Sequence, residues 1–140
     1  MNSGDIVGFR YSSEKVKGRV EYVELMVLSE DDDRIYGFRL NTGRIPERIL
    51  QKIIKFISIN MKKIDMKNAE KYSNITRKMT EQEQAHDLFY NSTNRRLFNT
   101  LEKELVSDTS KQKIVTYLFR GISKKNVRSK FQDLNRKYHI

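Results

Sequence analysis

The sequence predicts an α+β fold, in which a small β-barrel is followed by a helical C-terminal half. Residues 6–40 are rich in β-branched and aromatic side chains that fall on alternate positions, which is typical of strands. Residues 80–138 repeat apolar side chains every three or four positions, which is typical of amphipathic helices. We therefore divide the 140 residues into a barrel at 1–59, a basic linker or short helix at 60–79 and a helical domain at 80–140.

Three strands are predicted in the first 40 residues. The first is at 6–11, where alternate side chains are apolar. The second is at 16–28 and is long enough to be one bent strand or two strands with a bulge near Glu24. The acidic cluster at 30–33 predicts a turn, and the third strand follows at 34–40.

Residues 46–64 are compatible with two structures. In the first, Gly43 takes a positive φ in a tight turn, Pro46 starts a helical turn that ends near Gln51, and 53–59 forms a last strand. The alternative is one long helix from Pro46, because apolar residues recur at near-helical spacing. These residues are Ile49, Ile53, Ile57, Met61 and Ile64.

Two short motifs lie in the predicted barrel. Gly4-Asp5-Ile6-Val7 followed by Lys17-Gly18-Arg19-Val20 is similar to the opening turn and central glycine of a KOW motif. Arg34–Leu40 is similar to the core of a WYL domain, although the chain has no Trp, and Glu21 stands where a KOW motif has its second glycine. The segment thus resembles the SH3-like barrels of the KOW, Tudor or WYL type. The resemblance implies binding to nucleic acid or to proteins of the transcription and translation machinery.

The helical half begins with a capping box. In Thr80-Glu-Gln-Glu83 the Thr hydroxyl can accept from a free amide while the Glu reaches back to the chain. A break at 91–94 precedes a second helix with one apolar stripe, whose members we assign to the core. They are Leu97, Phe98, Leu101 and Leu105.

A basic helical hairpin is predicted at the C-terminal end. A helix at 111–120 ends at Gly121, which would cap it with positive φ, and Ser123 can cap a final helix. The arrangement resembles a helix-turn-helix unit, with Gly121 at the turn glycine and Val127 at the buried position six residues later. Tyr117 departs from that motif, which usually has a small residue there. The apolar stripe of the final helix would be Val127, Phe131, Leu134 and Tyr138.

The positive charge is concentrated in this predicted hairpin. The chain has 28 Lys+Arg and 18 Asp+Glu, and residues 110–140 contain 9 of the basic residues and 1 of the acidic ones. Such a field attracts polyanions. We predict non-catalytic nucleic-acid binding, to double-stranded DNA ahead of RNA, in an accessory or regulatory role such as transcription regulation. The predicted contacts are Lys111, Lys113, Arg120, Lys124, Lys125, Arg128, Lys130, Gln132, Asn135, Arg136 and Lys137, with Gln132 and Asn135 meeting base edges.

A second basic set lies in the predicted barrel and is a candidate phosphate-facing rim, unless it pairs with local acids. It consists of Arg10, Lys17, Arg19, Arg39, Arg44 and Arg48. The alternative function is a protein-interaction module that binds and modulates an acidic enzyme or polymerase surface. The oligomeric state is left open, because the apolar helices can also pair between chains.

The composition excludes several other classes. The absence of Cys excludes disulfides and thiol chemistry, and no apolar stretch suggests a membrane span or a signal peptide, so a cytoplasmic protein is expected. His86 and His139 have no partner at metal-ligand spacing, and no phosphate loop or nucleophile motif occurs. Carboxylates such as Glu21, Glu24 and Asp31 could converge in the fold, but their spacing singles out none of them. We predict no metal, no cofactor and no enzymatic activity, and the Lys-, Ile- and Asn-rich composition suggests an AT-rich bacterial or viral gene.

Overall fold

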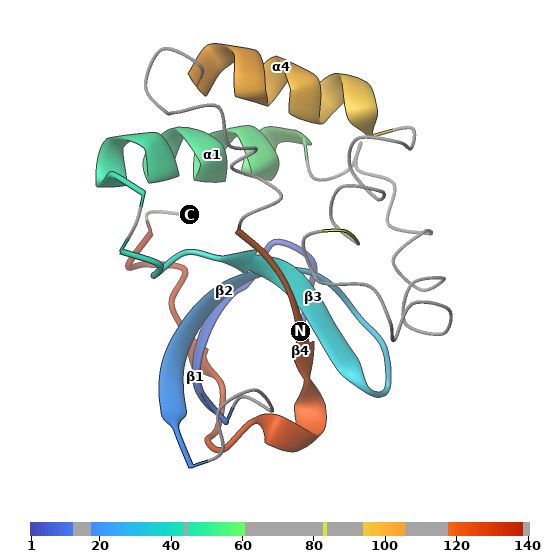
Figure 1. Cartoon of the computed structure of the whole chain (residues 1–140), viewed down its shortest axis with the longest axis vertical. Coiled ribbons are helices and arrows are strands. Elements are labelled where there is room, and N and C mark those ends of the chain that lie inside the picture. The colour runs from blue at the N-terminus through green and yellow to red at the C-terminus, as the bar shows by residue number, and fades with distance from the viewer. Residues whose placement is uncertain (13–17, 44, 61–82, 84–93, 106–117, 139–140) are drawn as a thin grey trace. The chain divides into compact units, whose positions relative to one another are not determined.

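The computed structural model describes the chain at residues 1–12, 18–43, 45–60, 83, 94–105 and 118–138. The chain divides into two compact units. One joins Met1–Asn41 to Arg120–Ile140, and the other is Thr42–Phe119. The first unit is therefore built from both ends of the chain (Figure 1).

The first unit is a five-stranded sheet in the order β4-β3-β2-β1-β5. Antiparallel pairs join β1 to β2, β2 to β3 and β1 to β5. The predicted strands at 6–11 and 34–40 are confirmed. Residues 20–28 lie in one strand, whose irregularity falls between Val27 and Ser29 and not near Glu24, while 16 and 17 lie outside the described residues. The strands are β1 (Ile6–Ser12), β2 (Val20–Glu30), β3 (Arg34–Arg39), β4 (Phe119–Ser123) and β5 (Gln132–Asp133).

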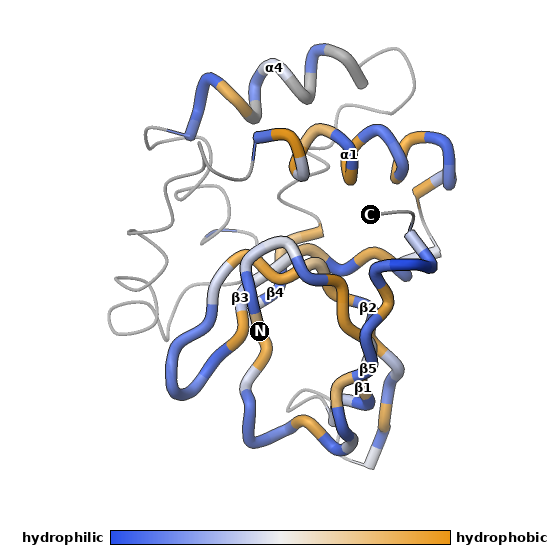
Figure 2. Tube along the Cα trace, turned by 180° about the vertical axis from the view of Figure 1, so that it is seen from behind, coloured by the Kyte–Doolittle hydropathy of each residue, from blue (hydrophilic) through white to orange (hydrophobic). Residues whose placement is uncertain are grey.

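The sheet curls so that one of its faces encloses an apolar core (Figure 1). Alternate residues of β1, β2, β3 and β4 supply this core, and apolar residues accordingly recur along the strands in Figure 2. Tyr11 and Val127 are half-buried against it. The buried core residues are Val7, Phe9, Val23, Leu25, Val27, Ile35 and Ile122.

The connection between β2 and β3 is the predicted acidic turn. The Asp31 carboxylate accepts hydrogen bonds from the backbone N–H groups of Asp33 and Arg34 at 2.8 and 2.7 Å. An aspartate can therefore close this turn with its own side chain, as Asx turns do. The expected positive φ of Gly43 is also confirmed, with a value of 69°.

The second unit contains two α-helices in its described part, α1 (Glu47–Asn60) and α4 (Arg95–Leu105), which contact each other. The predicted strand at 53–59 is wrong, and the alternative of a helix from Pro46 is right. The Pro46 carbonyl accepts from the N–H groups of Ile49 and Leu50 at 3.0 Å, so the helix begins directly after the proline. The helix predicted after 91–94 is confirmed as α4, while residues 91–93 lie outside the described residues.

The predicted helical C-terminal half is wrong. Within the described residues, the chain from Phe119 onward forms β4, the 3₁₀ turn η2 (Lys124–Asn126) and β5, and the helix-turn-helix-like hairpin is not present. Gly121 lies in the middle of β4 and not at a helix end, and a Cβ there would meet the Tyr36 ring at 3.3 Å. The segments at 61–82 and 111–117, with the predicted linker, most of the capping box and Lys111 and Lys113, lie outside the described residues.

The free edge of β1 explains why this segment is extended. An edge strand presents unpaired N–H and C=O groups, and buried backbone groups need partners. Arg128 donates its N–H to the Arg10 carbonyl and Leu134 donates to the Ile6 carbonyl, both at 2.8 Å. Pairing with this distant edge outweighs the local helical spacing of Val127, Phe131, Leu134 and Tyr138.

Candidate functional site

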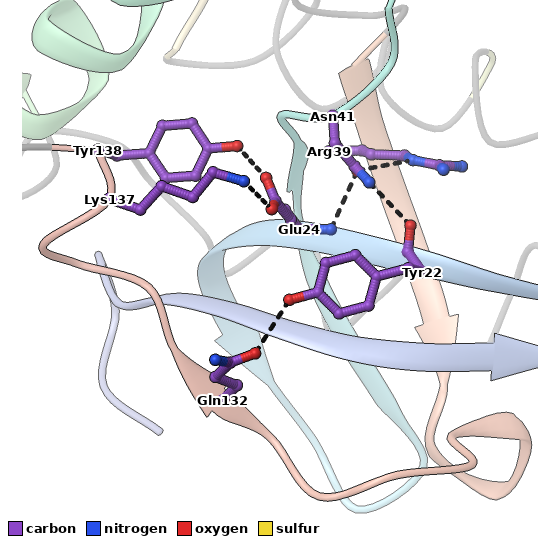
Figure 3. A network of polar contacts seen from close by, with 7 residues as sticks. All are labelled: Tyr22, Glu24, Arg39, Asn41, Gln132, Lys137 and Tyr138. Carbon is purple, nitrogen blue, oxygen red and sulfur yellow. Dashed lines mark hydrogen bonds and ion pairs between the residues drawn. The ribbon is translucent and has the colours of Figure 1, made fainter.

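Tyr22 of β2 lies across β1 on the face of the sheet opposite to the core cluster that contains Phe9 and Val23. We call this the outer face, although Ile6 and Met26 farther along it are buried. Its hydroxyl donates to the Gln132 side-chain oxygen on β5 at 3.2 Å (Figure 3). The ring can pass over β1 because Gly8 has no side chain: a Cβ there would lie 2.1 Å from the Tyr22 Oη atom. Tyr22 is nevertheless 43% exposed, so an aromatic ring is fixed on the surface of the sheet.

Tyr22, Arg10 and Arg128 form a row across three adjacent segments. Arg10 pairs directly with Tyr22 in the β1–β2 register, so their side chains share the outer face. On the other side of β1, Val127 bridges Tyr11, and both of these side chains pack toward the core. Because neighbouring residues of an extended segment point to opposite faces, Arg10 and Arg128 both point outward. We call Tyr22, Arg10 and Arg128 the Tyr22 row.

Lys130 extends this positive region. The Arg10 N–H donates to the Ser129 hydroxyl at 2.8 Å, which fixes the segment that carries Arg128 and Lys130 beside β1. Arg10, Arg128 and Lys130 are exposed. Within the described residues, no carboxylate lies within ion-pair distance of any of the three. We call these three residues the basic edge.

A buried carboxylate holds the end of the chain against the sheet next to this face. Glu24 is only 4% exposed, and both Lys137 Nζ and the Tyr138 hydroxyl donate to it (Figure 3). These donors compensate a charge that would be costly to bury alone. Lys137 is therefore partly committed to a structural ion pair.

Asn41 fixes the backbone directly after Tyr22, on both sides of Val23. Its amide nitrogen donates to the Tyr22 carbonyl at 2.8 Å, and its oxygen accepts from the Glu24 N–H at 3.0 Å. Arg39 Nε donates to the same Asn41 oxygen at 3.1 Å, while its Nη1 pairs with Glu21 at 3.2 Å. The Asn41 side chain thus continues the ladder that β3 makes with β2 (Figure 3).

A separate ionic cluster lies at the far end of β2. Glu30 pairs with Lys124 Nζ at 2.9 Å and with the N-terminal ammonium at 3.1 Å. Hydrogen bonds from Lys124 and from the N-terminal amine hold the pKa of Glu30 below its ordinary value. Lys124 is therefore neutralised by a local acid and is a weaker candidate for a phosphate contact.

No family model, curated protein or solved structure matches this chain. The site is therefore assigned from its own chemistry. No group of three acidic or histidine side chains in the described part of the chain is arranged to hold a metal ion. The three carboxylates considered in the sequence have separate partners. Glu21 pairs with Arg39, and Glu24 accepts from Lys137 and Tyr138. Asp31 accepts from backbone N–H groups of its own turn. No helix among the described residues combines the length and the apolar composition that a membrane span requires.

The structure brings together some of the predicted contact residues and separates others. Gln132 and Asn135, which were expected to meet bases, are held in protein contacts, with Tyr22 and with the Ile6 N–H. Of the others near the C-terminus, Arg120 lies in β4, Lys124 and Lys125 lie in η2, and Arg136 and Lys137 lie in the turn after β5. The remaining members of that set are Arg128 and Lys130 on the basic edge, and Lys111 and Lys113 outside the described residues.

The predicted rim is also divided. Arg10 belongs to the basic edge, whereas Arg19 and Arg39 pair with Glu21 at 3.6 and 3.2 Å. Arg48 lies in α1 in the second unit. Lys17 and Arg44 lie outside the described residues. From the sequence, Tyr22 was assigned to a strand but not to a site. The signal that could have identified it is its place two residues after Val20, on the same face of a strand with arginines nearby.

Proposed function

We propose that this protein binds nucleic acid, without catalysing a reaction on it, through the basic edge of the curled sheet. The decisive observation is the Tyr22 row, in which two arginines that have no acidic partner among the described residues stand beside an exposed aromatic ring. Like charges directly opposite each other on a sheet are unfavourable. A bound phosphate backbone would relieve this repulsion and release counterions at the same time.

The element proposed here differs from the predicted hairpin, although Arg128 and Lys130 are common to both. The basic residues act from β1 and from the extended segment beside it, so they follow the backbone of the ligand and do not insert a helix into a groove. An SH3-like barrel of the KOW, Tudor or WYL type, which the N-terminal motifs resemble, would present such a surface. A regulatory or accessory role in the cytoplasm suits a small nucleic-acid-binding protein of this kind.

A matched pair of triple variants tests this proposal. Arg10→Gln/Arg128→Gln/Lys130→Gln removes the basic edge, while Arg95→Gln/Arg96→Gln/Lys103→Gln removes three exposed charges from α4 in the second unit. Binding to fluorescent oligonucleotides is measured by anisotropy for the full chain. We expect the first variant to bind at least about tenfold more weakly and the second to bind nearly as the parent does.

Two other results would contradict the proposal. Equal losses of affinity in the two variants would mean that the net charge of the protein attracts the ligand and that no specific site binds it. No measurable binding by the parent chain would favour the alternative function, in which Val20 and Tyr22, both exposed, contact an acidic protein partner.

A further inference from the structure

We propose that the ligand is single-stranded, and that one unpaired base stacks on the ring of Tyr22. This inference rests on the proposed function and specifies its ligand. It depends on three properties of the Tyr22 row: the ring is fixed, its outer side is accessible, and cations stand directly beside it.

The ring is fixed before any ligand binds. Gly8 lies beneath its hydroxyl end, Gln132 accepts from the hydroxyl, and Asn41 holds the Tyr22 backbone carbonyl. Fixing a side chain in advance reduces the entropy that binding would otherwise cost. Phe131 is exposed to a similar extent, 41% against 43% for Tyr22, but it packs edge-on against the core residue Phe9 at a centroid distance of 5.2 Å.

The accessible side of the ring suits an unpaired base. Every base has a π-face, so stacking on an aromatic side chain tolerates any sequence. Arg10 stands directly opposite Tyr22 in the β1–β2 register and Arg128 stands beyond it, so the phosphates that flank a stacked base would meet guanidinium groups. A strand with its bases on Tyr22 and its backbone along the basic edge would satisfy both kinds of contact.

A duplex fits this surface less well. Bases inside a duplex are stacked on one another and show only their edges in the grooves. The two amide side chains that were expected to meet base edges, Gln132 and Asn135, already bond to Tyr22 and to the Ile6 N–H. The described part of the first unit has strands and one 3₁₀ turn, without an α-helix to enter the major groove.

Three variants separate the loss of stacking from a loss of folding. Tyr22→Leu removes the ring and Tyr22→Phe keeps it, while Phe131→Leu removes a similarly exposed aromatic residue from another position. We expect Tyr22→Leu to bind a single-stranded oligonucleotide about 10- to 100-fold more weakly, and Tyr22→Phe and Phe131→Leu to bind it within about threefold of the parent. Circular dichroism of each variant checks that the sheet is retained.

A second measurement uses the unaltered protein, so it does not depend on how the variants fold. A single-stranded oligonucleotide containing 2-aminopurine is titrated with the full chain, and stacking on an aromatic ring quenches the probe. Quenching, together with binding weaker to the matching duplex than to the single strand, supports the proposal.

The failures of the two proposals are distinguishable. If Tyr22→Leu binds as the parent does while the basic-edge variant loses affinity, the stacking inference is overturned and nucleic-acid binding stands. Binding to the duplex as tight as to the single strand would also overturn it. If the parent binds neither ligand, both proposals fail.

Discussion

The backbone N–H of Arg128 donates to the carbonyl oxygen of Arg10 over 2.8 Å, and the adjacent Tyr11–Val127 bridge places the two arginines opposite each other on neighbouring extended segments. One residue comes from the first strand and the other from the last twenty residues of the chain. Their juxtaposition completes the edge of the sheet and concentrates positive charge beside Tyr22. It is the basis of the functional proposal and of the first prediction.

Replacing Arg128 with Thr will stabilise the free protein while weakening ligand binding. The change removes a like-charge neighbour of Arg10 and introduces a residue that favours extended structure, and it loses only an exposed 3.3 Å hydrogen bond from Arg128 Nη1 to the Lys125 carbonyl. We expect the free energy of unfolding in urea to rise by a few tenths of a kcal/mol at low salt, with the difference shrinking as salt screens the charges. A loss of stability would instead show that Arg128 supports the fold.

Replacing Gly8 with Ala will destabilise the first unit and displace the Tyr22 ring. A Cβ at Gly8 would lie 2.1 Å from Tyr22 Oη and 2.9 Å from Leu134 Cδ1, so both neighbours must move. Overpacking of this kind costs about 1–3 kcal/mol of unfolding free energy. Urea denaturation measures the loss, and Ser12→Ala, on the same strand and face, is the control expected to cost less than about 0.5 kcal/mol.

A double-mutant cycle assigns this cost to the ring. Gly8→Ala is measured in the parent and again in a Tyr22→Ala background, where the ring is absent. We expect the penalty of Gly8→Ala to fall by about 0.5 kcal/mol or more, because residues in contact are energetically coupled. An unchanged penalty would mean that Leu134, and not Tyr22, makes Gly8 necessary.

Replacing Tyr138 with Phe removes only one oxygen atom, but it will destabilise the protein measurably. The hydroxyl donates to the buried Glu24 carboxylate, and its removal leaves Lys137 as the other donor. Hydrogen bonds to charged groups contribute about 1.5–3 kcal/mol, so a loss in that range is expected by urea denaturation. An unchanged free energy of unfolding in Tyr138→Phe would show that the Tyr138 hydroxyl does not stabilise the Glu24 carboxylate.

The Glu30 cluster predicts a pH dependence of stability. Lys124 first, and the N-terminal amine second, lower the folded-state pKa of Glu30 from 4.5. The contribution to stability is therefore present above pH 4.5 and is lost as the pH falls through the lower folded-state pKa. The unfolding temperatures of the parent and of Lys124→Met are measured from neutral pH to about pH 3. The two temperatures should differ at neutral pH and converge at the acidic end. A constant difference across that range would contradict this assignment.

The sequence identified the strands of the N-terminal part because their signals are local. Alternation at 6–11 and 34–40 and the Asp31 turn depend on neighbouring residues, and the structure confirms them. At 53–59, β-branched residues favour a strand, whereas the spacing of Ile49, Ile53 and Ile57 favours a helix, and the helix forms.

The C-terminal segment was mispredicted because its partner is distant in the chain. The Arg10 N–H and the Ser129 hydroxyl that accepts from it are 119 positions apart, and no local pattern records such a pairing. Gly121 shows the same problem, since the Tyr36 ring lies close to it in the fold and its position is not that of a helix end. The cations of the site could be listed from the sequence, but their arrangement around Tyr22 depends on this long-range pairing.

The salt dependence of binding tests the central claim most directly. The affinity of the full chain for a single-stranded oligonucleotide is measured across a salt series, for the parent and for Arg10→Gln/Arg128→Gln/Lys130→Gln. If the three side chains contact phosphates, the log–log slope should become shallower by about 2, because each contact on a single strand contributes about 0.7. A slope that stays the same in the variant would show that the basic edge does not bind the phosphate backbone.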